Sequence, residues 1–254
     1  MEGTTPMATR TRTRSRTLGR IGKGLLAPAL ALGATVGLAS APASAAVWNT
    51  CDQWGNTSLG GYTLYNNIWG SGAGSQCVWA NSGTNWGVWA NHPNTGGIKS
   101  YPNSKKVINK SITSLGSLNS SYNVTVPSSG AYNTSYDVWD TDHDYEIMLW
   151  VNRTGAVGAL GSFQQSVSVG GHSWNVYKGR AYRSDGTYWD VISFLRTSNS
   201  TSGTVQILPV LKWIKDTKGW MGNETIGDVQ FGFEVTSSSG GLNFTANNLT
   251  VSSS

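Results

Sequence analysis

Residues 145–152 alternate between two kinds of side chain with the period of two that a β-strand imposes. One face is purely aliphatic and suits a hydrophobic core. The other carries an acid, a thioether and an indole, which are costly to bury and therefore favour a surface open to a ligand. The aliphatic face comprises Ile147, Leu149 and Val151, and the mixed face comprises Glu146, Met148 and Trp150.

Residues 228–235 repeat this arrangement on a second predicted strand. Their apolar face comprises Val229, Phe231, Phe233 and Val235, and their polar face comprises Asp228, Gln230, Gly232 and Glu234. We therefore expect two strands that each present one glutamate on the face opposite a hydrophobic core.

Short alternating runs separated by glycine- and asparagine-rich turns fill most of the remaining chain. Strands are expected at residues 62–65, 107–118, 136–139, 164–169, 173–177, 189–195 and 242–251, whereas the Ser- and Asn-rich residues 119–135 are expected to be a loop or weak strand. One helix is expected, with Pro209 in its first turn and Gly219 at its end. Its apolar residues are Ile207, Val210, Leu211 and Ile214. The pattern predicts an all-β sandwich of two antiparallel sheets with one short helix.

The first 45 residues have the composition of a secretory signal peptide. A basic start from Arg10 to Lys23 precedes an apolar stretch at residues 25–38, and Ala43-Ser44-Ala45 resembles a cleavage site. The alternative is a membrane anchor, but the apolar stretch is shorter than the roughly 20 residues of a membrane span and Pro28 interrupts it. We expect residues 1–45 to be removed and residues 46–254 to form one secreted, extracellular domain.

Removing the leader changes the charge of the protein. It holds six of the 18 basic and one of the 13 acidic residues, which leaves 12 of each in residues 46–254. The mature chain therefore has no net charge and no basic surface typical of nucleic-acid binding. Cys51 and Cys77 are expected to pair in an exported protein, although two free thiols remain the alternative. All 12 tryptophans follow the leader, a composition that suits stacking against sugar rings.

Glycoside hydrolysis is the chemistry that needs two carboxyl groups on one open surface. Of the three glutamates after residue 45, Glu224 lies in a predicted turn, so Glu146 and Glu234 are the candidate pair. The alternative for each is an ordinary solvent-facing position. In a retaining mechanism one carboxylate attacks the anomeric carbon and the other acts as acid and then base, with the two groups about 5–5.5 Å apart. Neighbouring strands of one sheet could provide that spacing, and Gly232 would leave room for a sugar ring.

Both predicted strands resemble segments of glycoside hydrolase family 12, the secreted endoglucanases. Tyr145-Glu146-Ile147-Met148-Leu149-Trp150 is similar to the family's nucleophile strand, and Val229-Gln230-Phe231-Gly232-Phe233-Glu234 to its acid/base strand. Residues 51–54, 65–70, 98–103 and 135–138 also resemble family segments, in the family's order. The resemblance therefore covers nearly the whole mature chain.

The resemblance implies a jelly-roll sandwich with an open cleft on its concave sheet, and retaining cleavage of internal β-1,4-glucan bonds. It implies that Glu146 is the nucleophile, that Glu234 is the acid/base and that Asp137 supports the nucleophile. It also implies a Cys51–Cys77 disulfide. The binding residues it implies are Trp54, Asn67, Trp69, Met148 and Trp150.

The chain departs from the family pattern in two places. Residues 155–161 have alanine where the family has proline, so a looser cleft-crossing loop is expected. Residues 86–97 do not align cleanly, which leaves open whether Trp86 or Trp89 faces sugar. Preference for xyloglucan over cellulose therefore remains a second interpretation, and a non-catalytic carbohydrate-binding sandwich a third.

No cofactor or metal is expected. Asp140, Asp142, His143 and Asp144 lack the spacing of a calcium loop, and the three histidines lack that of a zinc site. The expected partner is a β-glucan chain, with no nucleic acid or membrane, and the mature protein is expected to be a monomer.

Overall fold

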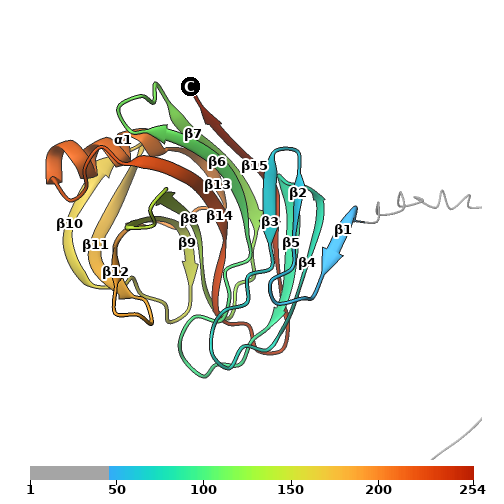
Figure 1. The fold of residues 1–254 in the computed structure, drawn as a ribbon. Coiled ribbons are helices and arrows are strands. Elements are labelled where there is room, and N and C mark those ends of the chain that lie inside the picture. The colour runs from blue at the N-terminus through green and yellow to red at the C-terminus, as the bar shows by residue number, and fades with distance from the viewer. Residues whose placement is uncertain (1–45) are drawn as a thin grey trace, which may run out of the picture. The chain divides into compact units, whose positions relative to one another are not determined.

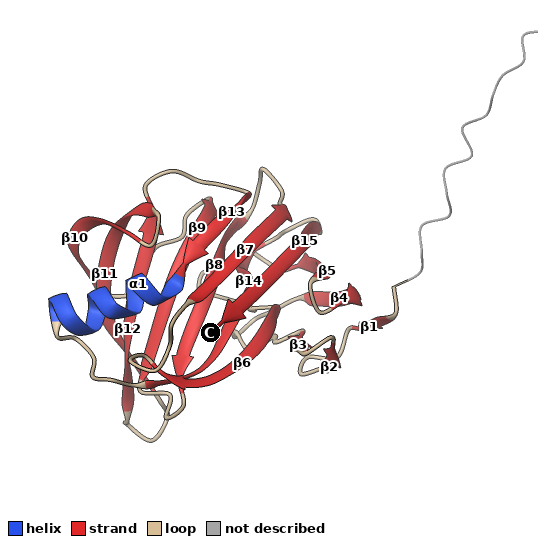
Figure 2. Cartoon of the chain, turned by 90° about the horizontal axis from the view of Figure 1, so that it is seen from above, coloured by secondary structure: helices blue, strands red, loops and turns tan. Residues whose placement is uncertain are grey.

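The structure, a computed structural model, describes residues 46–254, so the predicted leader lies outside the described residues. The alternating segments pair into two β-sheets that stack face to face, with a short helix beside them (Figures 1 and 2). The prediction of an all-β sandwich with one short helix is confirmed.

The smaller sheet has six strands, all paired antiparallel. In spatial order they are β1 (Trp48–Thr50), β4 (Ser75–Ser82), β5 (Asn85–Asn91), β15 (Leu242–Ser253), β7 (Leu118–Thr125) and β13 (Ser202–Gln206).

The larger sheet has nine strands and is strongly curved (Figure 1). In spatial order they are β10 (Ser162–Val169), β11 (His172–Tyr182), β12 (Tyr188–Arg196), β9 (Tyr145–Thr154), β8 (Ala131–Asp140), β14 (Thr225–Ser237), β6 (Asn103–Ser111), β3 (Tyr62–Tyr65) and β2 (Asn56–Leu59).

One pair in this sheet departs from the antiparallel prediction, because β9 and β12 run parallel. Since β10, β11 and β12 form an antiparallel meander, β10 also runs in the direction of β9. Residues 155–161 must therefore carry the chain from the end of β9 back to the start of β10. This short connection therefore has to run back across the sheet rather than turn at its edge.

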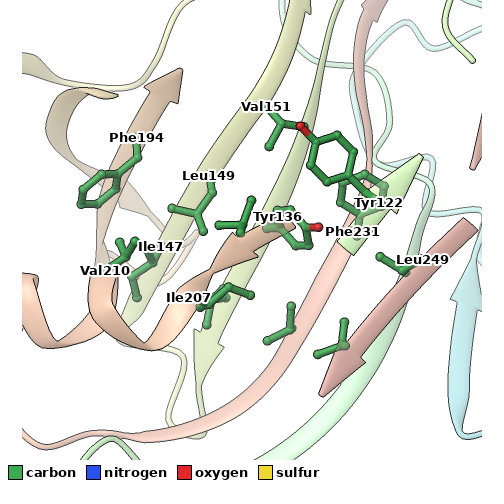
Figure 3. Packing of buried hydrophobic residues seen from close by; sticks show 14 of the residues in the cluster. Tyr122, Tyr136, Ile147, Leu149, Val151, Phe194, Ile207, Val210, Phe231 and Leu249 are labelled. Carbon is green, nitrogen blue, oxygen red and sulfur yellow. The ribbon is translucent and has the colours of Figure 1, made fainter. Parts of the chain in front are cut away.

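The core lies between the two sheets and matches the predicted apolar faces. Ile147, Leu149 and Val151 of β9 have no exposed surface, and the same holds for Phe231 and Phe233 of β14. Figure 3 shows several of these side chains packed together with residues of the helix.

The predicted helix is confirmed, and its two halves differ in geometry. It begins as an α-helix, α1 (Ile207–Lys212), and continues as a π-helix, η1 (Trp213–Lys218), which ends at Gly219 in the left-handed conformation, with φ of 60°. The four predicted apolar residues are fully buried, and Ile207 and Val210 lie beside Ile147 in the core (Figure 3). The π-helical half was not apparent from the spacing.

Residues 119–135 were expected to be a loop or weak strand, and most of them form the regular strands β7 and β8. The strand predicted for residues 107–118 is correspondingly shorter and ends at Ser111. Ser and Asn have low intrinsic strand propensity, but propensity is overridden where strands are paired on both sides. Strand β7 lies between β15 and β13, and β8 lies between β9 and β14.

A buried histidine joins the loops at one end of the molecule. His92 has no exposed surface, and its Nδ1 accepts a hydrogen bond from the Gly74 N–H at 3.0 Å. Its Nε2 lies 2.9 Å from Gln76 Oε1, so a neutral ring with the proton on Nε2 satisfies both contacts. Burial, and then the charge of Lys99, lowers the pKa of His92 from 6.5 to about 4.

Acid is therefore expected to weaken this contact. Because the pKa of His92 is lower in the folded state than in the unfolded state, its contribution to stability is complete above about pH 6.5 and declines as the pH falls towards 4. In urea unfolding, the stability advantage of the wild type over His92→Gln should shrink by about 2–3 kcal/mol between pH 7 and pH 4.5. A difference that stays constant with pH would contradict this assignment.

Candidate active site

The two predicted glutamates leave the nine-stranded sheet on the face opposite the core. Glu146 alternates with fully buried Ile147 in β9, and Glu234 alternates with fully buried Phe233 in β14. Both glutamates are half-buried. We call this surface, which carries Glu146, Asp137 and Glu234, the acidic face.

The expectation that the two glutamates lie on neighbouring strands is wrong, because β8 lies between β9 and β14. Glu146 is opposite Trp139 of β8, and Glu234 is opposite Asn133 of the same strand. Asp137 lies between these two positions. The hairpin β8–β9 is local in sequence, whereas β14 joins the other side of β8 from a distant part of the chain. The intervening strand thus contributes a third carboxyl group to the pair.

Asp137 is only 5% exposed, and Ser135 Oγ donates a hydrogen bond to its Oδ1 at 3.2 Å. Burial raises the pKa of Asp137 well above its usual value, and the charges of Glu146 and Glu234 raise it further. The raised pKa favours the protonated form of Asp137, in which its carboxyl group can donate the hydrogen bond that it shares with Glu146.

Glu146 has a second donor from another strand. Trp189 Nε1 of β12 donates to Glu146 Oε2 at 2.7 Å. Burial raises the pKa of Glu146 to about 7, while the hydrogen bonds from Trp189 and Asp137 act in the opposite direction. Two donors therefore favour the ionised form of Glu146.

Glu234 receives a hydrogen bond from Asn133 Nδ2. Burial raises the pKa of Glu234 to about 7, and the charge of Glu146 adds to the increase. Glu234 thus has one hydrogen-bond donor, whereas Glu146 has two. The charge of Glu146 raises the pKa of both Asp137 and Glu234, so the three carboxyl groups do not lose their protons independently.

Three of the predicted binding residues lie in two segments that are hydrogen-bonded to each other, residues 53–55 and residues 66–69. Trp54 and Trp69 are 60% and 48% exposed, and Asn67 is half-buried, with its Nδ2 donating to the Tyr101 carbonyl at 3.1 Å. Ile68 bridges to Ser100, which in turn bridges to Val235. The segment of Asn67 and Trp69 is therefore joined through Ser100 to β14 beside Glu234.

Met148 and Trp150 are placed differently, since they are only 6% and 3% exposed. They form a small hydrophobic cluster with Val191 and Leu195, and Val157 and Ala159 of the 155–161 connection pack against it. These two predicted binding residues are therefore covered by the connection that crosses the sheet.

Neither Trp86 nor Trp89 belongs to the acidic face. Trp86 is fully buried in the core and Trp89 is 37% exposed, and both lie on β5 of the six-stranded sheet.

Sequence reasoning missed the two side chains that hold the glutamates, Trp189 and Asn133. Trp189 stands at the start of a predicted strand, and the period of two, which puts it on the face opposite the apolar residues Ile192 and Phe194, could have placed it on the acidic face. Asn133 fell within the segment that was predicted to be a loop or weak strand. In both cases the partner is distant along the chain.

The predicted disulfide between Cys51 and Cys77 is present and fastens the segment that carries Trp54 to β4. Within residues 46–254, no three His, Cys, Asp or Glu side chains gather as a metal site would require. The Asp140 carboxylate instead accepts backbone N–H groups of Asp142 and Tyr145 and so stabilises its own turn. No helix in the described part of the chain is long and apolar enough to cross a membrane.

Comparisons with known proteins agree with this geometry. A family model described as glycosyl hydrolase family 12 matches residues 60–253. A probable xyloglucan-specific endo-β-1,4-glucanase A of Aspergillus terreus is 32% identical over 211 residues, which cover 74% of this chain and 81% of that protein. Endoglucanase S of Pectobacterium parmentieri is 30% identical over 210 residues, covering 72% and 79% of the two chains.

Two solved structures share the fold at comparable or higher identity. The xyloglucanase domain of NopAA, a type three effector from Sinorhizobium fredii solved with cellobiose, has a TM-score of 0.77 and 40% identity, and the match covers 82% of this chain and 99% of that one. A family 12 xyloglucanase from Bacillus licheniformis has a TM-score of 0.74 and 28% identity, with 82% and 100% covered.

Proposed function

The chain belongs to glycosyl hydrolase family 12, and we propose that it hydrolyses internal β-1,4-glucosidic bonds by double displacement, with Glu146 as nucleophile and Glu234 as acid/base. The observation that carries this proposal is the carboxyl cluster of the acidic face, where Glu146 has two hydrogen-bond donors and Glu234 has one. This difference assigns the ionised role to Glu146 and the protonated role to Glu234.

In the first step Glu146 attacks the anomeric carbon while Glu234 gives its proton to the departing glycosidic oxygen. In the second step Glu234, now ionised, takes a proton from water, and the water oxygen displaces Glu146 from the same carbon. Two inversions at one carbon give net retention. Asp137 supports the nucleophile, because its protonated carboxyl group donates to Glu146 and adds no negative charge beside it.

The substrate is a β-glucan chain that stacks on the exposed indoles of Trp54 and Trp69. Such rings offer apolar faces to the C–H faces of glucose units. Xyloglucan is a second candidate substrate, because the Aspergillus terreus relative is a probable xyloglucan-specific glucanase and the Sinorhizobium fredii relative is a xyloglucanase domain. We further propose that residues 1–45 direct export, in keeping with the disulfide between Cys51 and Cys77.

Proton NMR of the products tests the reaction and the substrate together. Barley glucan, cellulose and xyloglucan are hydrolysed in parallel, and the first reducing ends should appear as the β-anomer before they equilibrate. The substrate with the highest kcat/KM decides between a general glucanase and a xyloglucan-specific one. The α-anomer as first product would contradict double displacement, and binding without new reducing ends would indicate a non-catalytic carbohydrate-binding protein.

A further inference from the structure

The hairpin between β11 and β12 carries a tryptophan that donates to the proposed nucleophile but transfers no proton in the proposed reaction. Trp189, at the start of β12, is half-buried, and its indole N–H points to Glu146 Oε2 at 2.7 Å. On β12, Val191 is the residue paired with Glu146 in the parallel register. Trp189 lies two residues before Val191 on β12, and its side chain reaches the Glu146 carboxylate from there.

An arginine of the same hairpin holds this indole in place. The Arg183 guanidinium carbon lies 5.1 Å from the centroid of the Trp189 ring. Arg183 is itself fixed by hydrogen bonds from its guanidinium to the backbone carbonyls of His143 and Tyr188. The Trp139 ring lies 6.0 Å from that of Trp189. The indole is thus confined by side chains from two strands and the hairpin turn.

The charge on Glu146 changes during the reaction, so a fixed donor does not affect both steps equally. An N–H donor binds a carboxylate more strongly than it binds the oxygen of an ester. In the first displacement Glu146 loses its negative charge as it forms the bond to the anomeric carbon. In the second, the bond between that carbon and Glu146 breaks, and the electron pair returns to the carboxylate.

We propose that Trp189, held by Arg183, is a positioning residue that stabilises Glu146 as the leaving group of the second displacement. The proposal rests on the proposed function. Donation to Oε2 makes the carboxylate less basic, which improves its departure and makes it a slightly weaker nucleophile in the first step. The other groups that act on Glu146 are Asp137 of β8, Glu234 of β14 and Tyr101 before β6, and all three remain present in the Trp189 variants.

The lifetime of the glycosyl-enzyme measures this role directly. The enzyme is labelled with 2,4-dinitrophenyl 2-deoxy-2-fluoro-β-cellobioside, freed of excess reagent, and followed as activity returns by hydrolysis of the adduct. The sharpest variant carries benzothienylalanine at position 189, which keeps the shape of the indole and replaces its N–H by sulfur. Reactivation should slow about 10-fold, in line with the strength of hydrogen bonds to charged groups.

Further variants separate this role from a general loss of structure. Trp189→Phe should slow reactivation to a similar extent, and Arg183→Gln should do so more weakly, because the donor remains but is less well held. Tyr188→Phe, on the same hairpin, should reactivate at the wild-type rate. In addition, kcat and KM for dinitrophenyl cellobioside should fall together in the benzothienylalanine variant, so that kcat/KM changes less than about 3-fold.

The alternative outcomes identify which proposal has failed. Unchanged reactivation in the benzothienylalanine variant, or a fall in kcat/KM without a longer-lived adduct, would overturn the role of Trp189. A label found on a residue other than Glu146, or no label in the wild type, would instead overturn the proposed double displacement.

Discussion

Replacing Glu146 by Gln is expected to lower kcat on soluble cellulose by at least roughly 10²-fold. The amide has nearly the same shape as the carboxylate but carries no charge with which to attack the anomeric carbon. It can still accept a hydrogen bond from Trp189, so the fold should be retained and the thermal unfolding temperature should change little. Release of reducing ends from carboxymethylcellulose measures the effect.

A matched control is Glu224→Gln. Glu224 is the remaining glutamate of the described residues, and its Oε1 accepts the Gly222 N–H within a turn. This variant should keep wild-type activity. Activity of Glu146→Gln above a few per cent of the wild type would refute the assignment of the nucleophile.

A smaller residue at the same position gives a positive test. In Glu146→Ala, azide can occupy the space of the missing carboxylate and attack dinitrophenyl β-cellobioside directly. One displacement inverts the anomeric carbon, so the product should be the α-glycosyl azide. A β-azide from this variant would place the nucleophile elsewhere.

Replacing Glu234 by Gln should lower kcat on cellulose by a similar factor, at least roughly 10²-fold, for a different reason. Glucose is a poor leaving group and needs the proton of Glu234, whereas dinitrophenolate does not. The loss in the first step should therefore be much smaller with dinitrophenyl cellobioside, and the glycosyl-enzyme should accumulate because no base activates water. Equal losses on both substrates would argue against an acid/base role.

The pH profile provides a second test of Glu234. Its pKa is raised to about 7 in the free enzyme, and only the protonated form can donate to the leaving group. In the wild type, kcat/KM on cellulose should therefore fall as the pH rises through the pKa of this group. The alkaline fall should disappear in Glu234→Gln, since an amide does not titrate in this range. If the fall persisted unchanged, another group would be the acid.

Local alternation was enough to predict which side chains face the core and which lie on the opposite face of the sheet. Ile147 and Phe233 are buried, and Glu146 and Glu234 lie on the opposite face, because the period of two belongs to any extended strand regardless of its partners. The helical spacing of residues 207–214 was informative for the same reason. Segments without such a period, such as residues 119–135, were misjudged.

By itself, the sequence indicated the candidate glutamate pair, the disulfide partners and the all-β class, since each depends on residue type and near-neighbour order. Only the tertiary structure decided that β8 separates the two glutamates and contributes Asp137 between them. It alone placed Trp189 on Glu146 and covered Trp150 with the 155–161 connection. The physical reason is that the partners of a strand are selected by burial across the whole chain, which no local pattern encodes.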